Sequence, residues 1–404
     1  MSMLESATFR FNPGLELVVF DRLDPALRVR LADLTRDPSF YGILVPVGGV
    51  PLASTAATAR AVDRESALLL LTLRTPGPIP EYARRLLGPN AWHTITGLVL
   101  DGVLEIECAG AFRSGAAAVD VIDAVAVDGS DIAPDDIHPR GLVARLSIDA
   151  LRHAAALPVD DVAELARRLY GYNRLPLTPG NAAPALPTTD LARLGLDARG
   201  VAATLDREWT CTASGVDGEW LCWSAAERWA STDATRGTCK LYVSPMPEAT
   251  RGAFAATVAA STVHDALAFK VGAGHYGLLR PDKIVVYFRH REALYAAAAA
   301  LTDALAGAPA QGVPFTAAIT ADGMLSWAAD PPAHVGVAGG TGTESWRSWL
   351  TMQLAAALIA GRVGQPGVPD RPDPVRFALR RASALRIDPQ TWIPADTVWR
   401  DGTA

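Results

Sequence analysis

The three lysines of this 404-residue chain, Lys240, Lys270 and Lys283, lie within one stretch, whereas the other 34 of its 37 basic residues are arginines. An amine can lose its proton and act as a base or a nucleophile, but a guanidinium group cannot. A chain that otherwise uses arginine for its cations therefore indicates that the amine itself matters between residues 238 and 291. The chemistry that this pattern favours is proton abstraction.

Other groups that can transfer protons or bind anions lie in the same stretch. His275 stands among the glycines of segment 272–277 and has an ordinary pKa near neutrality, so it is a candidate for proton transfer, although it could equally be a loop residue without a role. Tyr287 is the fourth candidate catalytic residue, beside Lys240 and Lys270. Arg280 could hold a phosphate through its two-pronged guanidinium, or it could form a structural ion pair with Asp282.

Three strands are predicted in this region by alternation of polar and apolar residues. Their polar residues share one face because successive side chains in a strand point to opposite sides. If the strands pair, these residues form a cationic surface suited to an anion. The strands are expected at 240–244, 266–270 and 283–289, and the candidate anion ligands are Arg280, Lys283, Arg289 and Arg291.

A second glycine-rich segment, 335–343, runs into a predicted helix that begins near Ser345. Free backbone N–H groups at a helix N-terminus attract anions. Arg347 lies in the first turn of that helix, so it is a further candidate ligand for phosphate; the segment could also be a surface loop. Segment 272–277 matches GxGxxG, but Pro281 follows too soon for the long helix of a dinucleotide-binding fold.

The N-terminal part predicts a strand near 41–47, three helices and a β-hairpin. Asp63 is expected to cap the first helix, and the others are expected at 80–87 and 91–100. This order is that of a winged helix, yet helix 91–100 has no Arg or Lys for DNA. The segment 40–115 resembles the peptide-binding winged helix of the PQQ peptide-chaperone family, the RiPP recognition element. The resemblance implies that a leader peptide adds as a strand to an exposed sheet edge. A small α+β packing domain without a peptide site remains an equal alternative.

Composition excludes several classes of protein. The net charge of −6 and the absence of a long basic face argue against nucleic-acid binding. We expect no signal peptide and no membrane span, because the N-terminus lacks an apolar region and the longest apolar run is short. The four cysteines have no metal-ligand spacing, so no metal is expected. We therefore expect a cytoplasmic protein.

The predicted fold class is α+β, with a winged-helix-like domain followed by a mixed α/β catalytic domain. A proline-rich segment at 175–186 is typical of a linker. We therefore predict a leader-peptide-binding domain at 1–120, a helical connector with a linker at 121–190, and the catalytic domain at 191–404.

The catalytic part resembles the Hop-A type III effector family over roughly 200–355. The resemblance implies relatives that act in class V lanthipeptide and thioamitide biosynthesis, where a separate kinase-like protein phosphorylates Ser or Thr of a precursor peptide. The Hop-A-like partner would then eliminate the phosphate without a cofactor, leaving dehydroalanine or dehydrobutyrine. The blocks that carry the resemblance are Lys240-Leu-Tyr-Val-Ser-Pro, Phe269-Lys270, Arg280-Pro-Asp-Lys-Ile-Val-Val-Tyr287, Gly312-Val-Pro-Phe-Thr316 and Leu325-Ser-Trp-Ala.

Two alternatives remain open at this stage. The catalytic part could be a phosphopeptide-binding module that organises a complex with the kinase, or a cyclase that adds a Cys thiol to the dehydro residue. Phosphate release separates the lyase from both. The sequence does not identify the precursor, the processed Ser or Thr, which lysine is the base, or the oligomeric state.

Overall fold

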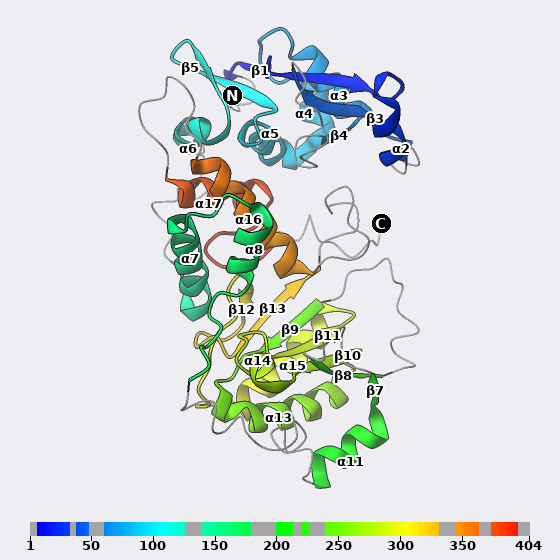
Figure 1. Cartoon of the computed structure of the whole chain (residues 1–404), viewed down its shortest axis with the longest axis vertical. Coiled ribbons are helices and arrows are strands. Elements are labelled where there is room, and N and C mark those ends of the chain that lie inside the picture. Colours follow the sequence, from blue (N-terminus) through cyan, green and yellow to red (C-terminus); the bar gives the residue numbers. More distant parts are fainter. Residues whose placement is uncertain are drawn as a thin grey trace. The chain divides into compact units, whose positions relative to one another are not determined.

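The structure is a computed structural model that describes residues 6–32, 38–47, 60–125, 139–178, 199–212, 220–225, 239–330, 345–362 and 373–394. Helices and strands both contribute to it, so the fold is α+β, as predicted (Figure 1). Contacts divide the chain into two units. The first comprises Met1–Asp136 with Ile359–Leu385, and the second comprises Ile137–Leu358 with Arg386–Ala404.

These units differ from the predicted division at 120 and 190. The segment expected to be a connector carries two helices of the second unit, and a C-terminal helix belongs to the first unit.

The first unit contains two three-stranded antiparallel sheets, in the orders β2-β3-β4 and β1-β5-β6. The order of a strand, three helices (α3, α4, α5) and a hairpin (β5, β6) matches the sequence prediction. The elements are β1 (Phe9–Phe11), β2 (Leu15–Val19), η1 (Phe20–Arg22), α2 (Pro25–Arg30), β3 (Phe40–Pro46), β4 (Arg60–Asp63), α3 (Arg64–Thr72), α4 (Glu81–Leu87), η3 (Gly88–Asn90), α5 (Ala91–Leu100), β5 (Leu104–Cys108), β6 (Ala111–Arg113), η4 (Gly115–Ala118), α6 (Val119–Val125) and α17 (Pro374–Ala384).

Local signals explain where these helices begin. The Asp63 carboxylate accepts a hydrogen bond from the Ser66 N–H (2.7 Å) and caps α3, as predicted. Asp373 caps α17 in the same way through the Val375 N–H (3.0 Å), and Pro374 occupies the first helical position, where its missing N–H has no cost. Capping thus fixes both a helix that the sequence predicted and one that it did not.

The second unit is built on a seven-stranded sheet with the order β12-β13-β9-β11-β10-β8-β7, in which every neighbouring pair is antiparallel. The division between the units falls inside α16. The elements are α7 (Gly141–Ala156), α8 (Val162–Tyr170), α11 (Arg199–Glu208), β7 (Thr210–Thr212), β8 (Trp220–Ser224), β9 (Cys239–Val243), η6 (Pro247–Ala249), α13 (Thr250–Val263), β10 (Ala268–Gly272), α14 (Gly274–Leu278), β11 (Ile284–Phe288), α15 (Arg291–Ala304), β12 (Ala317–Ala318), β13 (Leu325–Ala329) and α16 (Trp346–Arg362).

One face of the sheet is covered by α13 and α15 (Figure 1). The apolar residues of every second position point to this side and form the core with the two helices. Examples are Leu241 of β9, Phe269 of β10 and Val286 of β11, all at most 1% exposed. The three strands predicted around the lysines are confirmed as neighbours in this sheet, in the order β9-β11-β10.

The segment 139–178 is an integral part of the second unit. Ser147 lies inside α7; its Oγ donates to the Val143 carbonyl and accepts the Phe315 N–H (2.7 Å). The Asn173 side chain donates to the carbonyl oxygens of Gln311 and Gly312, both at 2.9 Å. The hydrogen bonds to Gln311, Gly312 and Phe315 connect the segment to residues 311–315 of the same unit.

Candidate active site

The second face of the sheet carries the polar residues of β8, β9, β10, β11 and β13. In the register of the sheet, Tyr287 of β11 lies opposite Lys240 of β9, and Lys270 of β10 lies opposite Cys222 of β8. We call this the polar face. It comprises Trp220, Cys222, Lys240, Tyr242, Lys270, Tyr287 and Ser326.

Lys240 is held in place by an acidic residue. Its ammonium group donates to Asp330 Oδ1 (2.6 Å) and lies 5.4 Å from the centre of the Tyr287 ring. The same carboxylate oxygen accepts the backbone N–H of Trp346 at the start of α16 (3.1 Å). Lys240 is therefore a fixed, ion-paired cation of the polar face.

Lys270 has a different environment. Its side chain is half-buried, with the ammonium nitrogen 4.0 Å from the centre of the Trp220 ring. Within the described part of the chain this nitrogen has no hydrogen-bond or ion-pair partner. Burial lowers the pKa of Lys270, and the positive charges of Lys240 and Arg280 lower it further, against the opposing charge of Asp282. Deprotonation of the amine therefore costs less free energy here than on a surface lysine.

Tyr287 completes the pattern predicted for the polar face. Burial raises the pKa of its phenol above the ordinary value, and the Asp330 carboxylate adds to the effect. The hydroxyl group consequently keeps its proton and can serve as a donor. Lys240, Lys270 and Tyr287, three of the four predicted catalytic residues, thus occupy adjacent strands of one face.

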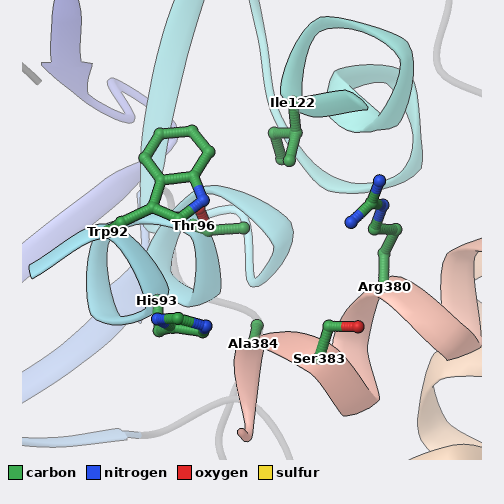
Figure 2. A pocket seen from close by; sticks show the side chains of 7 residues that line it. All are labelled: Trp92, His93, Thr96, Ile122, Arg380, Ser383 and Ala384. Carbon is green, nitrogen blue, oxygen red and sulfur yellow. The ribbon is translucent and has the colours of Figure 1, made fainter. Parts of the chain in front are cut away.

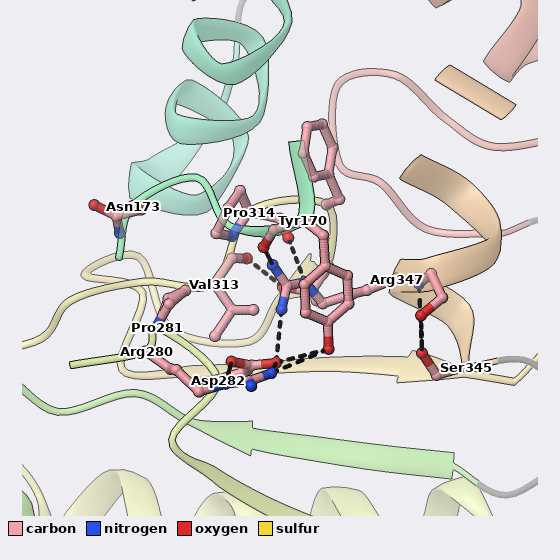
Figure 3. Close-up of polar contacts among 12 residues, drawn as sticks. Tyr170, Asn173, Arg280, Pro281, Asp282, Val313, Pro314, Ser345 and Arg347 are labelled. Atoms are coloured by element: carbon pink, nitrogen blue, oxygen red, sulfur yellow. Dashed lines mark hydrogen bonds and ion pairs between the residues drawn. The ribbon is translucent and has the colours of Figure 1, made fainter. Parts of the chain in front are cut away.

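Arg280 forms the structural ion pair that the sequence had left as an alternative. Its Nε and Nη2 donate to the two carboxylate oxygens of Asp282 (3.0 and 3.2 Å), and its guanidinium lies 4.6 Å from the centre of the Trp220 ring. The Tyr170 hydroxyl also donates to Asp282, at 3.1 Å (Figure 3). Arg280 is thereby committed to a buried carboxylate.

Arg347 shares that carboxylate, which corrects its prediction as an anion ligand at a helix start. It is 1% exposed, and its nitrogens donate to the Pro314 carbonyl (3.2 Å), Asp282 (2.8 Å) and the Tyr170 carbonyl (2.7 Å) (Figure 3). Burial alone would raise the pKa of Asp282, but the two guanidinium charges hold it well below its usual range. Burial also raises the pKa of Tyr170, to about 12. This cluster of Tyr170, Arg280, Asp282 and Arg347 is structural.

Lys283 is likewise not an exposed phosphate ligand. It is fully buried, and its ammonium donates to the Pro245 carbonyl (2.6 Å) and to the Gln311 side chain. Burial lowers its pKa to about 7. The ammonium group of Lys283 is therefore bound inside the protein and is not available on the polar face.

Arg291 lies on the other side of the sheet. Its guanidinium is 5.0 Å from the centre of the Trp327 ring, and Trp327 belongs to the core beneath α15. The structure therefore does not bring Arg291 together with the lysines. Arg289 is half-buried directly after β11, and its predicted phosphate contact stays a prediction.

The glycine-rich segment after β10 forms the short helix α14 instead of an open loop. Gly272 is required there, because a Cβ would stand 2.3 Å from the Gly277 carbonyl oxygen. The backbone of His275 lies in α14; its side chain lies outside the described structure, so its role stays a prediction. Segment 335–343 also lies outside the described residues.

Sequence reasoning missed Trp220, Tyr170 and Asp330. Trp220 lies beside Lys270, Tyr170 completes the Asp282 cluster, and Asp330 pairs with Lys240. A signal existed only for Trp220, since it alternates with Cys222 in a short strand; the other two meet their partners from 90 or more positions away.

The described residues offer neither a metal site nor a membrane span. They contain no group of three or more His, Cys, Asp or Glu residues placed to hold a metal ion. Among their helices, none has both the length and the apolar character needed to cross a bilayer.

The second unit is thus an α+β domain with an antiparallel sheet and a cationic polar face. Two solved structures resemble the chain distantly. The effector protein from Pseudomonas syringae pv. syringae strain 61 is 14% identical, with a TM-score of 0.37 over 62% of this chain and 98% of that one. The effector protein from Pseudomonas syringae pv. tomato strain DC3000 is 13% identical, with a TM-score of 0.36 over 62% and 97%. No family model and no curated protein matches the chain, and similarity at this level assigns it no activity.

Proposed function

We propose that the second unit is a lyase that eliminates phosphate from phosphoserine or phosphothreonine in a peptide. The observation that carries this proposal is the environment of Lys270. Lys240 is ion-paired and Lys283 is buried against two acceptors, whereas Lys270 is half-buried, without a polar partner in the described structure, and has a lowered pKa. Such an amine has the properties of a general base.

The elimination balances without a further reactant. The Lys270 amine takes the proton from Cα of the phosphorylated residue and becomes an ammonium group. The electron pair of the broken C–H bond forms the Cα=Cβ double bond, and the Cβ–O bond breaks. Phosphate leaves with the electron pair of the broken Cβ–O bond, and the peptide retains dehydroalanine or dehydrobutyrine.

The neighbours of Lys270 suit the charges that develop. The Tyr287 phenol, protonated because its pKa is raised, can donate to the peptide carbonyl oxygen or to the departing phosphate. The Lys240 ammonium lowers the pKa of Lys270 and adds positive charge to the face that meets a phosphorylated substrate. Arg289 and His275 remain proposed contacts for the phosphate and the proton.

The wider setting follows from the family resemblance of the sequence. The substrate would be a ribosomal precursor peptide of the lanthipeptide type, phosphorylated by a kinase-like partner. The first unit would bind its leader peptide, and β2 and β4 are the outer strands of the sheet to which an added strand could pair. Binding of a full-length precursor at least tenfold more tightly than of its phosphorylated core alone would support this role; equal affinities would contradict it.

Lys270→Arg tests the activity, because it keeps the charge and removes the base. We expect phosphate release to fall by roughly 10²–10⁴-fold, while phosphopeptide affinity stays within about tenfold. Lys240→Arg is the matched control: an arginine can still pair with Asp330, so it should lose less activity than Lys270→Arg. Wild-type turnover in Lys270→Arg would exclude Lys270 as the base.

The same assay decides between the alternatives. Phosphopeptide binding without phosphate release would indicate a binding module, and thioether formation from a dehydrated peptide without phosphate release would indicate a cyclase. For the lyase, the rate should rise with pH as Lys270 loses its proton, with a midpoint below the ordinary lysine pKa of about 10.4.

A further inference from the structure

Trp220 is a half-buried aromatic residue at the start of β8, on the polar face. Its cross-strand neighbour on β10 is Gly272, which has no side chain, and Lys270 is the next residue of β10 on the same face. Diagonal neighbours of this kind lie within reach of an aromatic side chain. The Lys270 nitrogen accordingly lies 4.0 Å from the centre of the indole ring. The contact thus follows from the register of the two strands.

The same indole ring also contacts a cation that is held in place. The Arg280 guanidinium lies 4.6 Å from the ring centre, and it donates two hydrogen bonds, of 3.0 and 3.2 Å, to the buried Asp282 carboxylate. An arginine keeps its charge at every ordinary pH, whereas a lysine can lose its charge. Trp220 therefore lies against one permanent cation, which fixes the ring, and one amine that can titrate.

A lysine that acts as a base needs support of this kind. Its four-carbon side chain is flexible, and a reacting group misplaced by about 1 Å can lose about 10²-fold in rate. Within the described structure the Lys270 nitrogen has no hydrogen-bond or ion-pair partner. The contact that fixes the position of the amine is therefore the one with the indole ring.

The ring has two opposing effects on the amine. Its bulk keeps water away and favours the neutral form, whereas its π face attracts an ammonium group. Burial is the largest cause of the lowered pKa of Lys270, so the covering effect dominates before the reaction. The π face acts on the ammonium group that forms when Lys270 takes a proton.

The first unit also has a tryptophan and a cation in the wall of one pocket, but there the cation is an arginine. Trp92 and Arg380 both line the pocket between α5, α6 and α17 (Figure 2), and Arg380 is paired with Asp123. A guanidinium group cannot act as a base. The arrangement on the polar face differs because its second cation, Lys270, is an amine.

We propose that Trp220 is a positioning residue for the base. Its indole ring, fixed by Arg280, holds the Lys270 amine on the polar face and stabilises the ammonium group that proton abstraction creates. The catalytic part of this inference rests on the lyase activity proposed above, whereas the contact itself does not. Trp220 touches no reacting atom in this scheme and acts through Lys270.

NMR of the lysine side chains tests the contact without substrate. The full chain has only three lysines, so lysine labelled with ¹³C at the ε carbon gives few signals, and Lys270→Arg assigns the one from Lys270. The ring current of the indole should shift the Lys270 ε protons upfield, and Trp220→Leu should abolish that shift. Trp220→Ala admits water, so it should raise the pKa of Lys270 toward the ordinary value of about 10.4. Trp220→Leu keeps an apolar cover and should not raise it.

Kinetics on a phosphothreonine peptide test the effect on the base. Trp220→Ala should lower kcat by roughly 10–10²-fold and leave KM within about threefold, because the indole positions Lys270 rather than the substrate. The pH midpoint of kcat should rise together with the pKa of Lys270 measured by NMR. Trp220→Phe, which keeps an aromatic face, should restore most of the rate. Trp220→Leu should also lower kcat, and it provides the test if Trp220→Ala does not fold.

Trp223→Phe is the matched control. Trp223 lies on the same strand but belongs to the core on the other side of the sheet, so its replacement should lower stability and leave the Lys270 signal and kcat unchanged. An unchanged Lys270 shift in Trp220→Leu, an unchanged kcat and pH midpoint in Trp220→Ala, or an equal effect of Trp223→Phe would overturn the inference while phosphate release persists. The absence of phosphate release from the wild type would instead contradict the lyase, and with it the catalytic role of Trp220.

Discussion

Two clusters in this molecule, one in each unit, consist of two arginines that share one buried aspartate. In the second unit, Arg280 and Arg347 share Asp282; in the first, Arg376 and Arg380 share Asp123. The nitrogens Nε, Nη1 and Nη2 of Arg347 all have acceptors, whereas Nη2 of Arg380 has none in the described structure and lies in the wall of a pocket. Two arginines on one buried aspartate therefore form a cluster whose Arg347 donors are all satisfied in the second unit, and a cluster with an unsatisfied arginine donor in the first.

The largest expected effect comes from Asp282→Asn. This change leaves two buried guanidinium groups without their counter-charge and should cost about 3–5 kcal/mol of unfolding free energy. Native-state hydrogen exchange in β9 and β11 measures the second unit specifically. Asp149→Asn, which removes an exposed pair with Arg152, is the control and should cost less than about 0.5 kcal/mol. A loss below about 1 kcal/mol for Asp282→Asn would show that the cluster is not structural.

Acid should erase the difference between wild type and Asp282→Asn. Because the folded pKa of Asp282 is depressed, the unfolded chain binds a proton between the ordinary value of about 3.9 and the lower folded value. The stability contributed by this carboxylate is complete above that window and is lost as the pH falls through it. Urea unfolding of both proteins from pH 6 downward tests the direction.

A comparison of Arg347→Gln with Arg380→Gln sharpens the contrast between the clusters. We expect Arg347→Gln to destabilise its unit by roughly 2 kcal/mol more than Arg380→Gln destabilises its own. The reason is that Arg347→Gln leaves the Pro314 and Tyr170 carbonyls, and part of the Asp282 carboxylate, without a donor. In Arg380→Gln, Asp123 keeps its pair with Arg376. Hydrogen exchange in β9 and α5, respectively, measures the two losses, and equal losses would remove the distinction.

Lys283, next to Asp282 in the chain, predicts a smaller effect that depends on pH. Its folded pKa of about 7 lies below the unfolded value, so between these values the unfolded chain binds the extra proton. This group's contribution to stability therefore rises with pH above about 7, by at most ~1.4 kcal/mol per pH unit. Lys283→Met should show a flatter pH dependence between pH 7 and 9 in urea denaturation; the same slope in both proteins would contradict the lowered pKa.

The smallest effect is expected for Asp120→Asn. Its carboxylate is exposed, and Arg376 retains Asp123, so the change should cost no more than about 0.5 kcal/mol. A loss above about 1 kcal/mol would show that the exposed pair with Arg376 contributes more than a surface ion pair does.

The sequence predicted the elements whose signals are local. Alternation located β9, β10 and β11, and the cap at Asp63 located the start of α3. Alternation also placed Lys240, Lys270 and Tyr287 on one face, because a strand fixes the side of each residue once its register is known.

The errors concern partners that are distant in the sequence. For Arg280, the ion pair with Asp282 was one of two predicted alternatives because the two residues are neighbours in the sequence. The partners of Arg347 could not be predicted, because Asp282 and Tyr170 lie 65 and 177 positions away. Lys283 was predicted to bind an anion because none of its sequence neighbours indicates that Gln311, 28 positions away, accepts a hydrogen bond from its ammonium group. Arg291 follows Tyr287 and Arg289 at the two-residue spacing of one strand face. However, the chain turns into α15 at this point, and Arg291 lies on the opposite side of the sheet.

The assignment of α17 to the first unit has a consequence for synthesis on the ribosome. Residues 1–136 emerge early, but the helix that supplies Arg376, Arg380 and Arg381 to α5 and α6 begins only at Pro374. At about 5–20 residues per second, roughly 10–50 s pass between these points. During that interval Asp123 lacks its two arginines and the α5 surface lacks its cover. We therefore expect the first unit to complete its folding last, although it is made first.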